Sequence, residues 1–124
     1  MSIYCGTDII EIERIKNQIQ TYGNNFLDRI YTKREIEYCE SKKIMKYQHY
    51  AVRFAAKEAI FKTISTKIDN KYSINWTNLE VLNDENGRPI VYIRDIELNN
   101  IKNIDISLSH CKEYATAVAI AEIV

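Results

Sequence analysis

The apolar positions near the start of the chain indicate a strand that runs directly into a helix. Residues 3–10 (IYCGTDII) are mostly β-branched or aromatic, which is typical of a short strand. Between Glu11 and Ile19, isoleucines recur at helical spacing among charged residues, and Tyr22-Gly23-Asn24 follows as a stop signal. This pattern predicts a helix over about residues 11–22.

Two further helices are predicted before the middle of the chain. Thr32 followed three residues later by Glu35 forms a capping box, which indicates a helix from Thr32 to about Ser41. A basic stretch at 42–46 then leads into the longest helical segment, from about Tyr47 to Ser65.

The second half of the chain is dominated by strand patterns. We expect strands over 76–82, 90–93, 106–111 and 114–124, with residues 83–89 forming a turn rich in residues that tolerate unusual φ angles. Helices therefore come first and strands last, apart from the opening strand. That order predicts an α+β fold in which helices pack on a mostly antiparallel sheet.

Length and charge narrow the classes of protein that fit. The 124 residues (14.6 kDa) suit one domain over 1–124, and 46% hydrophobic residues are enough for an ordered core. Seventeen basic residues balance seventeen acidic ones, whereas proteins that bind nucleic acid usually carry a basic excess. We therefore expect no nucleic-acid partner.

Targeting and redox signals predict a cytoplasmic protein. The longest apolar run, Ala117 to Ala121, is five residues, far below the roughly eighteen that a membrane helix needs. The sequence does not open with a basic segment followed by an apolar stretch, so we expect no secretory signal. Cys5, Cys39 and Cys111 are odd in number and lack zinc-ligand spacing.

The long helix carries unusual charges. Tyr47, Tyr50, Phe54 and Phe61 form a stripe that we expect to face the core, opposite the small residues Ala56, Ala59 and Thr63. Lys57, Glu58 and Lys62 border that stripe, which would place them at the edge of a crevice. The simpler alternative is an i,i+4 ion pair between Glu58 and Lys62.

Asp8 is an acid within an apolar strand. Such a carboxylate is disfavoured unless it is paired, hydrogen-bonded or bound to a cation. The alternative is a strand-end residue that caps the following helix.

Three residues of the second half are also candidates for binding. His110 shares parity with Ile106 and Leu108, so it is expected to point with the apolar face, as a core residue or a catalyst. Asn86-Gly87 is first of all a turn, and the adjacent Arg88 would meet a phosphate or remain solvated.

Three segments together resemble a known family. Residues 6–14 (GTDIIEIER), 53–62 (RFAAKEAIFK) and 107–110 (SLSH) look like the signature segments of the 4'-phosphopantetheinyl transferases. The separation of about fifty residues between Asp8 and Glu58 resembles the short, single-domain holo-[acyl-carrier-protein] synthase branch. The resemblance spans nearly the whole chain, including the turn at 86–89.

The resemblance implies a reaction and roles for its residues. The enzymes of this family move the phosphopantetheine arm of coenzyme A to a serine of an acyl carrier protein, for fatty acid biosynthesis, and release 3',5'-ADP. By this resemblance Asp8 and Glu58 would hold Mg²⁺, and Glu58 would take the serine proton directly or through a metal-bound water. Lys62 would reach the pyrophosphate, and Lys57 would do the same or orient Glu58.

The same resemblance implies a homotrimer whose active sites lie between subunits. A neighbouring subunit would then supply the residues that bind the adenosine and its 3'-phosphate, namely Asn86, Gly87, Arg88, Pro89 and His110. The first helix, with Arg14, looks like the docking surface for the acidic carrier protein.

The chain departs from the family pattern at two places. Ser65, Thr66 and Lys67 stand where family members commonly carry glycines, so the backbone approach to coenzyme A is expected to differ there. Phe61 replaces a small polar residue and removes a phosphate contact. The rival hypothesis is a non-catalytic trimeric domain that keeps the fold and binds coenzyme A or a carrier protein.

Overall fold

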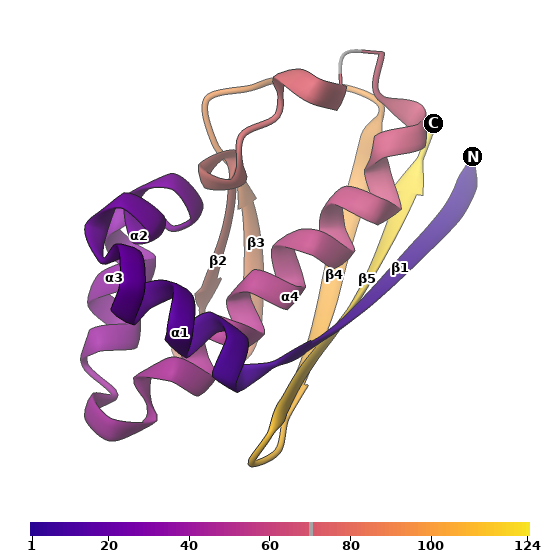
Figure 1. The fold of residues 1–124 in the computed structure, drawn as a ribbon. Helices are drawn as coiled ribbons and strands as arrows, with labels where there is room; N and C mark the ends of the chain where they lie inside the picture. Colours follow the sequence, from indigo (N-terminus) through magenta and orange to yellow (C-terminus); the bar gives the residue numbers. More distant parts are fainter. Residues whose placement is uncertain (70) are drawn as a thin grey trace.

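A long central helix lies across a three-stranded antiparallel sheet in the computed structural model, which describes residues 1–69 and 71–124 (Figure 1). The sheet has the order β1-β5-β4, and a separate hairpin is formed by β2 and β3. The strands are β1 (Ser2–Glu11), β2 (Leu79–Asn83), β3 (Pro89–Ile93), β4 (Ile101–His110) and β5 (Tyr114–Ile123). The helices are α1 (Ile12–Tyr22), α2 (Asn24–Ile30), α3 (Lys33–Glu40) and α4 (Lys46–Ile64). The predicted α+β class is confirmed.

Helix α4 approaches the sheet closely because small residues line its inner side. Ala55, Ala56 and Ala59 are fully buried. A Cβ on Gly6 of β1 would lie 2.6 Å from the Ala59 carbonyl oxygen and 2.6 Å from Thr63 Oγ1, so only glycine permits this contact. The small side of α4 is therefore a core face, contrary to the sequence-based expectation.

The aromatic stripe of α4 is only partly in the core. Tyr50 is fully buried, whereas Phe54 and Phe61 are half-buried. The rings of both phenylalanines contact Trp76, each at 6.2 Å between centroids. This helix is buried on several sides, so its aromatic residues pack against the elements beside the sheet.

Helices α1 to α3 gather at one end of the molecule, around the first half of α4 (Figure 1). Residues Ile12, Ile15 and Ile19 of α1 are buried, as predicted. The capping box at Thr32 and Glu35 is present, with Thr32 N donating to Glu35 Oε1 at 2.8 Å. Helix α2 was missed, because Gly23, at φ 55°, ends α1 and at once accepts the first hydrogen bonds of α2.

Two predicted strands have different limits in the structure. Residues 76–78 form a 3₁₀ turn, in which Asn75 N donates to the side chain of Asn78, so β2 begins only at Leu79. Strand β4 begins at Ile101 rather than at 106, and it ends at His110. Its first residues pair irregularly with β5. In the part of the chain that the structure describes, none of the helices combines the length and the apolar character needed to cross a membrane.

Candidate functional site

Asp8 and Glu58 line one cavity, although they are about fifty residues apart in the chain. Asp8 lies on the side of β1 that faces α4, and Glu58 projects from the middle of α4. The other lining residues include Arg14 and Gln18 of α1, Arg29 of α2, and Phe54 and Trp76. The cavity has a volume of about 500 Å³, enough to admit part of a small ligand.

Glu58 is a partly buried carboxylate beside another acid. Burial raises its pKa above the ordinary carboxylate value, the nearby charge of Asp8 raises it further, and Lys62 partly opposes both effects. A carboxylate with a raised pKa is a stronger base than an ordinary one once it has ionised. The negative charges of these two acids also favour a cation in the cavity that they share.

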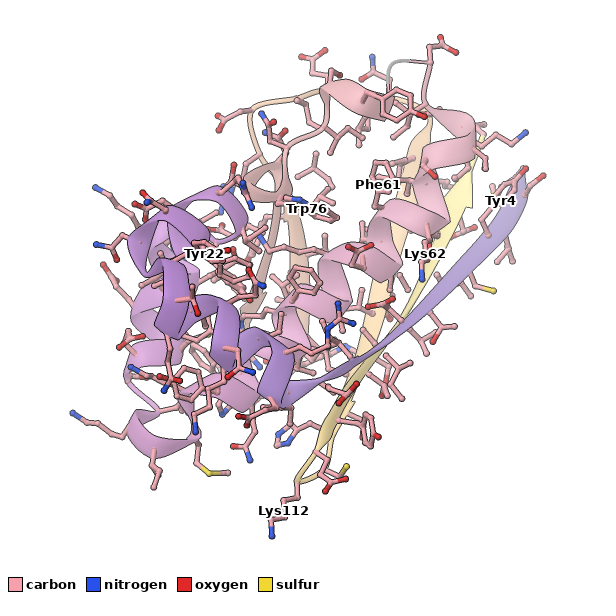
Figure 2. All side chains as sticks on the ribbon, viewed as in Figure 1. Tyr4, Tyr22, Phe61, Lys62, Trp76 and Lys112 are labelled. Atoms are coloured by element: carbon pink, nitrogen blue, oxygen red, sulfur yellow. The ribbon has the colours of Figure 1, made fainter. Side chains whose placement is uncertain are left out.

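Lys62 binds Asp8 instead of Glu58. Its Nζ lies 3.0 Å from Asp8 Oδ1 and 3.2 Å from the Thr7 carbonyl oxygen. Figure 2 shows this side chain reaching from α4 toward β1. The simple i,i+4 pair is therefore wrong, and Asp8 is a paired strand carboxylate rather than a helix cap. The Lys62 side chain is 51% exposed, so it has room to turn toward a bound anion.

The donor set suits a divalent cation that keeps water and substrate ligands. Within residues 1–69 and 71–124, no cluster of three or more His, Cys, Asp or Glu side chains has metal-binding geometry. Two carboxylates in one cavity nevertheless match Mg²⁺, which is commonly bound by one or two carboxylates together with phosphate oxygens and water.

Lys57 does not reach this cavity. Its side chain and that of Glu35 are both 0% exposed, and Nζ lies 2.7 Å from Glu35 Oε1. Burial lowers the pKa of Lys57, and Glu35 opposes that shift. The prediction that Lys57 reaches the pyrophosphate is therefore wrong.

A second cavity, of about 400 Å³, lies between the first half of α4, the β2–β3 turn and the edge strand β4. Gly87, Arg88, Pro89 and His110 line it, together with Tyr38, His49 and Arg53. Asn86 is not one of the described residues that line it. The predicted nucleotide-binding residues are thus gathered in one place, apart from Asn86.

The β2–β3 turn is held in shape by its own side chains. Asp84 Oδ1 accepts from the backbone of Asn86 at 2.8 Å and of Arg88 at 2.9 Å. Gly87 has a φ of 82°, which glycine adopts readily. Arg88 NH2 donates to Asp105 Oδ2 at 2.7 Å, so the guanidinium is directed toward β4.

His110 is exposed, contrary to the expectation of a core histidine. It points to the helix side of the sheet as its parity predicted, but it is the last residue of β4 and is exposed there. The centroids of the His110 and His49 rings lie 6.1 Å apart. The pKa of His49 is lowered to about 4, chiefly by burial and also by Arg53, so this histidine is neutral at pH 7.

Sequence reasoning missed several residues of the second cavity. Arg53 is buried and donates to the Val81 carbonyl oxygen at 3.1 Å and to Asn83 Oδ1 at 2.5 Å. Its position one turn before Lys57 was the available signal, because both are charged residues on the same helix face. Tyr38 and His49 gave no signal, since only the fold brings α3 and α4 together here.

Arg14 lies where the sequence placed it, on the exposed side of α1, and it also lines the cavity of Asp8 and Glu58. Ser65 to Lys67 form a 3₁₀ turn that continues α4. Phe61 packs against Trp76 (Figure 2), at the position where the family resemblance implies a small polar residue.

Comparisons with known proteins identify a single family. The profile of the 4'-phosphopantetheinyl transferase superfamily matches residues 4–119. A holo-[acyl-carrier-protein] synthase of Chlamydia muridarum is 48% identical over 95% of this chain and 93% of its own length. A holo-(acyl-carrier-protein) synthase of Bacillus anthracis, solved with CoA (3',5'-ADP), is 33% identical, with a TM-score of 0.78 over 98% of this chain and 96% of that one.

A further solved structure supports the fold alone. The ACPS-CoA complex of Chronobacterium ammoniagenes has a TM-score of 0.85 over 100% of this chain and 99% of that chain, at 24% identity. The helices and the antiparallel sheet therefore have the same arrangement in both proteins.

The raised pKa of Glu58 predicts that this residue lowers stability at neutral pH. Folded Glu58 binds its proton more tightly than the unfolded chain does, so the free energy of unfolding falls as the pH rises through the raised pKa. Glu58→Gln avoids that loss. Its melting temperature should exceed that of the wild type at pH 7, and the difference should shrink toward about pH 4.

The exposed carboxylate of Glu37 on α3 offers a matched control. Glu37→Gln should keep a melting temperature close to that of the wild type at pH 7 when thermal melts are followed by circular dichroism, because the side chain is exposed. Equal melting temperatures of the wild type and Glu58→Gln at pH 7 would contradict a raised pKa for Glu58.

Proposed function

Because the chain belongs to the 4'-phosphopantetheinyl transferase superfamily, we propose that it is a holo-[acyl-carrier-protein] synthase. It transfers the 4'-phosphopantetheine arm of coenzyme A to a serine of an apo-acyl carrier protein and releases 3',5'-ADP. The observation that carries the proposal is the cavity shared by Asp8 and Glu58, with Lys62 bound to Asp8. Together with a divalent cation held by the two carboxylates, these side chains would offset the negative charge of a diphosphate substrate.

The transfer is a displacement at phosphorus. The serine oxygen of the carrier protein attacks the phosphorus atom that bears the pantetheine arm, and a new oxygen–phosphorus bond forms. The bond from this phosphorus to the bridging oxygen of the diphosphate breaks, and 3',5'-ADP leaves with the electron pair. Glu58 accepts the proton of the serine, a role supported by its raised pKa.

Charge neutralisation is the other requirement of this reaction. We assign Asp8 and Glu58 as the residues that would hold Mg²⁺, which when bound offsets the negative charge of the diphosphate. Lys62 turns from Asp8 toward the diphosphate oxygens. Its single contact with a carboxylate and its exposure support that movement.

The nucleotide end of coenzyme A is assigned to the second cavity. Arg88 and His110 lie there with Gly87 and Pro89, and the guanidinium of Arg88 suits an adenosine 3'-phosphate. We also assign Asn86 to this end of the substrate, through the turn that it shares with Arg88.

Two subunits would complete one active site. Among the described residues, the linings of the Asp8–Glu58 cavity and of the Arg88–His110 cavity have none in common. A neighbouring chain that presents its Arg88–His110 cavity beside Asp8 and Glu58 would unite them, as in the proposed homotrimer. The outer face of the sheet supports an assembly, since it exposes Ile3, Ile9, Val118 and Ile120 by 68%, 64%, 48% and 46%.

Arg14 is proposed to dock the acidic carrier protein. It is exposed and lies at the rim of the cavity that holds Glu58, so a carboxylate of the carrier that binds it would bring the modified serine near the base. The cytoplasm and fatty acid biosynthesis are the setting that we propose, in keeping with the free thiols of Cys5, Cys39 and Cys111.

Mass spectrometry tests the proposed reaction. Incubation with apo-acyl carrier protein, coenzyme A and Mg²⁺ should add the mass of one phosphopantetheine to the carrier. Asp8→Ala and Glu58→Ala should each lower turnover by about 100-fold or more. Each variant removes a carboxylate proposed to hold Mg²⁺, and Glu58→Ala also removes the proposed base. A carrier whose mass does not change with the wild type would favour the non-catalytic binding domain, and near-normal turnover in either variant would reject these assignments.

Light scattering tests the assembly. The wild type should have about three times the chain mass of 14.6 kDa. Ile3→Asp places a charge on the outer sheet face and should give monomers with little transferase activity. Ile44, which is 90% exposed on the connection before α4, supplies the control, since Ile44→Asp should remain trimeric. A stable, fully active monomer would rule out the shared site.

Kinetics with varied carrier protein test the docking role of Arg14. Arg14→Glu should raise the KM for the carrier about tenfold, roughly 1.4 kcal/mol, and leave the KM for coenzyme A nearly unchanged. The effect should weaken with added salt, because exposed charges are screened. Lys33→Glu, a charge reversal on α3, should leave both constants as they are. Unchanged carrier kinetics in Arg14→Glu at low salt would show that Arg14 is merely solvated.

A further inference from the structure

A fully buried ion pair lies beside the carboxylate cavity but outside it. Lys57 and Glu35 are both 0% exposed, and their nitrogen and oxygen atoms lie 2.7 Å apart. Lys57 Nζ also donates to the carbonyl oxygen of Trp76 at 3.0 Å. The ammonium thus joins α4 both to α3 and to the turn that precedes β2.

Glu35 connects the same elements from the other side. Its Oε1 accepts from Thr32 N at 2.8 Å in the capping box of α3, and its Oε2 accepts from Val81 N of β2 at 2.8 Å. One carboxylate therefore binds α3, β2 and α4 at once. Loss of its geometry would affect all three elements.

Stability alone is a weak reason for such a pair. Removing two charges from water costs several kcal/mol per ion, and well-packed apolar residues often replace a buried pair without loss of stability. A buried pair can instead specify one arrangement among several that are similarly compact. Which arrangement this pair specifies follows from its place on α4.

The inner side of α4 is held close to the sheet where Ala59 and Thr63 lie against Gly6 of β1. Ala55, Ala56 and Ala59 lie against the sheet, and such small side chains allow a close approach without interlocking. Lys57 anchors the helix from another direction, through polar contacts that need a definite angle. Each residue turns a helix by about 100°, so the angle that suits Lys57 also sets the direction of Glu58.

We propose that Lys57 and Glu35 are positioning residues, which direct Glu58 toward Asp8 and hold Trp76 as a wall of the same cavity. Lys57 acts on Glu58 through the rotation of α4 and on Trp76 through its carbonyl oxygen. The inference rests on the proposed transferase activity for its kinetic measurement. Its spectroscopic measurement needs no activity.

Trp76 is the only tryptophan of the chain and reports on the cavity. Its ring contacts Phe54 and Phe61, and it lines the cavity together with Glu58. A displaced Trp76 should change its fluorescence emission and become more accessible to acrylamide, a soluble quencher. This readout is specific to the wall that Lys57 is proposed to hold.

The test compares E35L/K57M, K57M and K46M with the wild type. The double variant replaces the buried pair with apolar residues but also removes the acceptor of Thr32 N and Val81 N, so it should melt below the wild-type temperature. Measured below its melting temperature, its kcat should be lowered at least tenfold because Glu58 is misdirected. Its KM values for coenzyme A and carrier protein should stay within about twofold. Emission of Trp76 should shift and its quenching should rise.

K46M is the matched control on the same helix. Lys46 forms an exposed ion pair with Glu40 at 3.3 Å, so its loss should alter neither kcat nor Trp76 emission. If E35L/K57M does not fold, K57M measured below its melting temperature carries the same expectations for kcat and emission.

Wild-type kcat together with wild-type emission in a folded E35L/K57M or K57M protein would overturn the positioning role. A wild-type protein that transfers nothing would instead reject the transferase function. In that case an unchanged Trp76 emission in the variants would still overturn the inference. A shifted emission would still support the part of the inference in which Lys57 and Glu35 hold Trp76 in place.

Discussion

The close contact between α4 and β1 is the constraint on which the rest of the structure depends. Gly6 has no side chain, and the backbone of Ala59 with the hydroxyl of Thr63 occupies the space that a Cβ would need. The helix therefore lies flat on the sheet and is buried on several sides. Every other element packs around this pair, including the short helices and the β2–β3 hairpin.

Burial on several sides gives neighbouring charges on α4 very different surroundings. Lys57 is enclosed and satisfied by Glu35 and a backbone carbonyl. Glu58, the next residue, faces a cavity where burial and Asp8 raise its pKa. Lys62, one turn later, is half-exposed and binds Asp8. One helix thus carries a buried lysine in a structural ion pair (Lys57), a carboxylate with a raised pKa (Glu58) and a half-exposed lysine (Lys62).

The second cavity owes its shape to the hairpin and not to α4 alone. Asp84 closes the turn through backbone hydrogen bonds, and Arg53 ties the end of β2 to the helix. Arg88 is therefore held beside β4, in the same cavity as His110 and away from Asp8 and Glu58. In the proposed assembly, a substrate with a nucleotide at one end and a reactive diphosphate at the other would match this division.

The sequence by itself determined the α+β class, the capping box of α3, the long helix and the family, since these follow from local patterns and short motifs. It also placed Arg14 outward and singled out Asp8 and Glu58. It could not separate α1 from α2 at Gly23, because one glycine both ends a helix and begins another there. It could not assign the partners of Lys57 and Lys62, which come from α3 and β1. Only the tertiary structure decided these, because burial and pairing depend on segments that are distant in the chain.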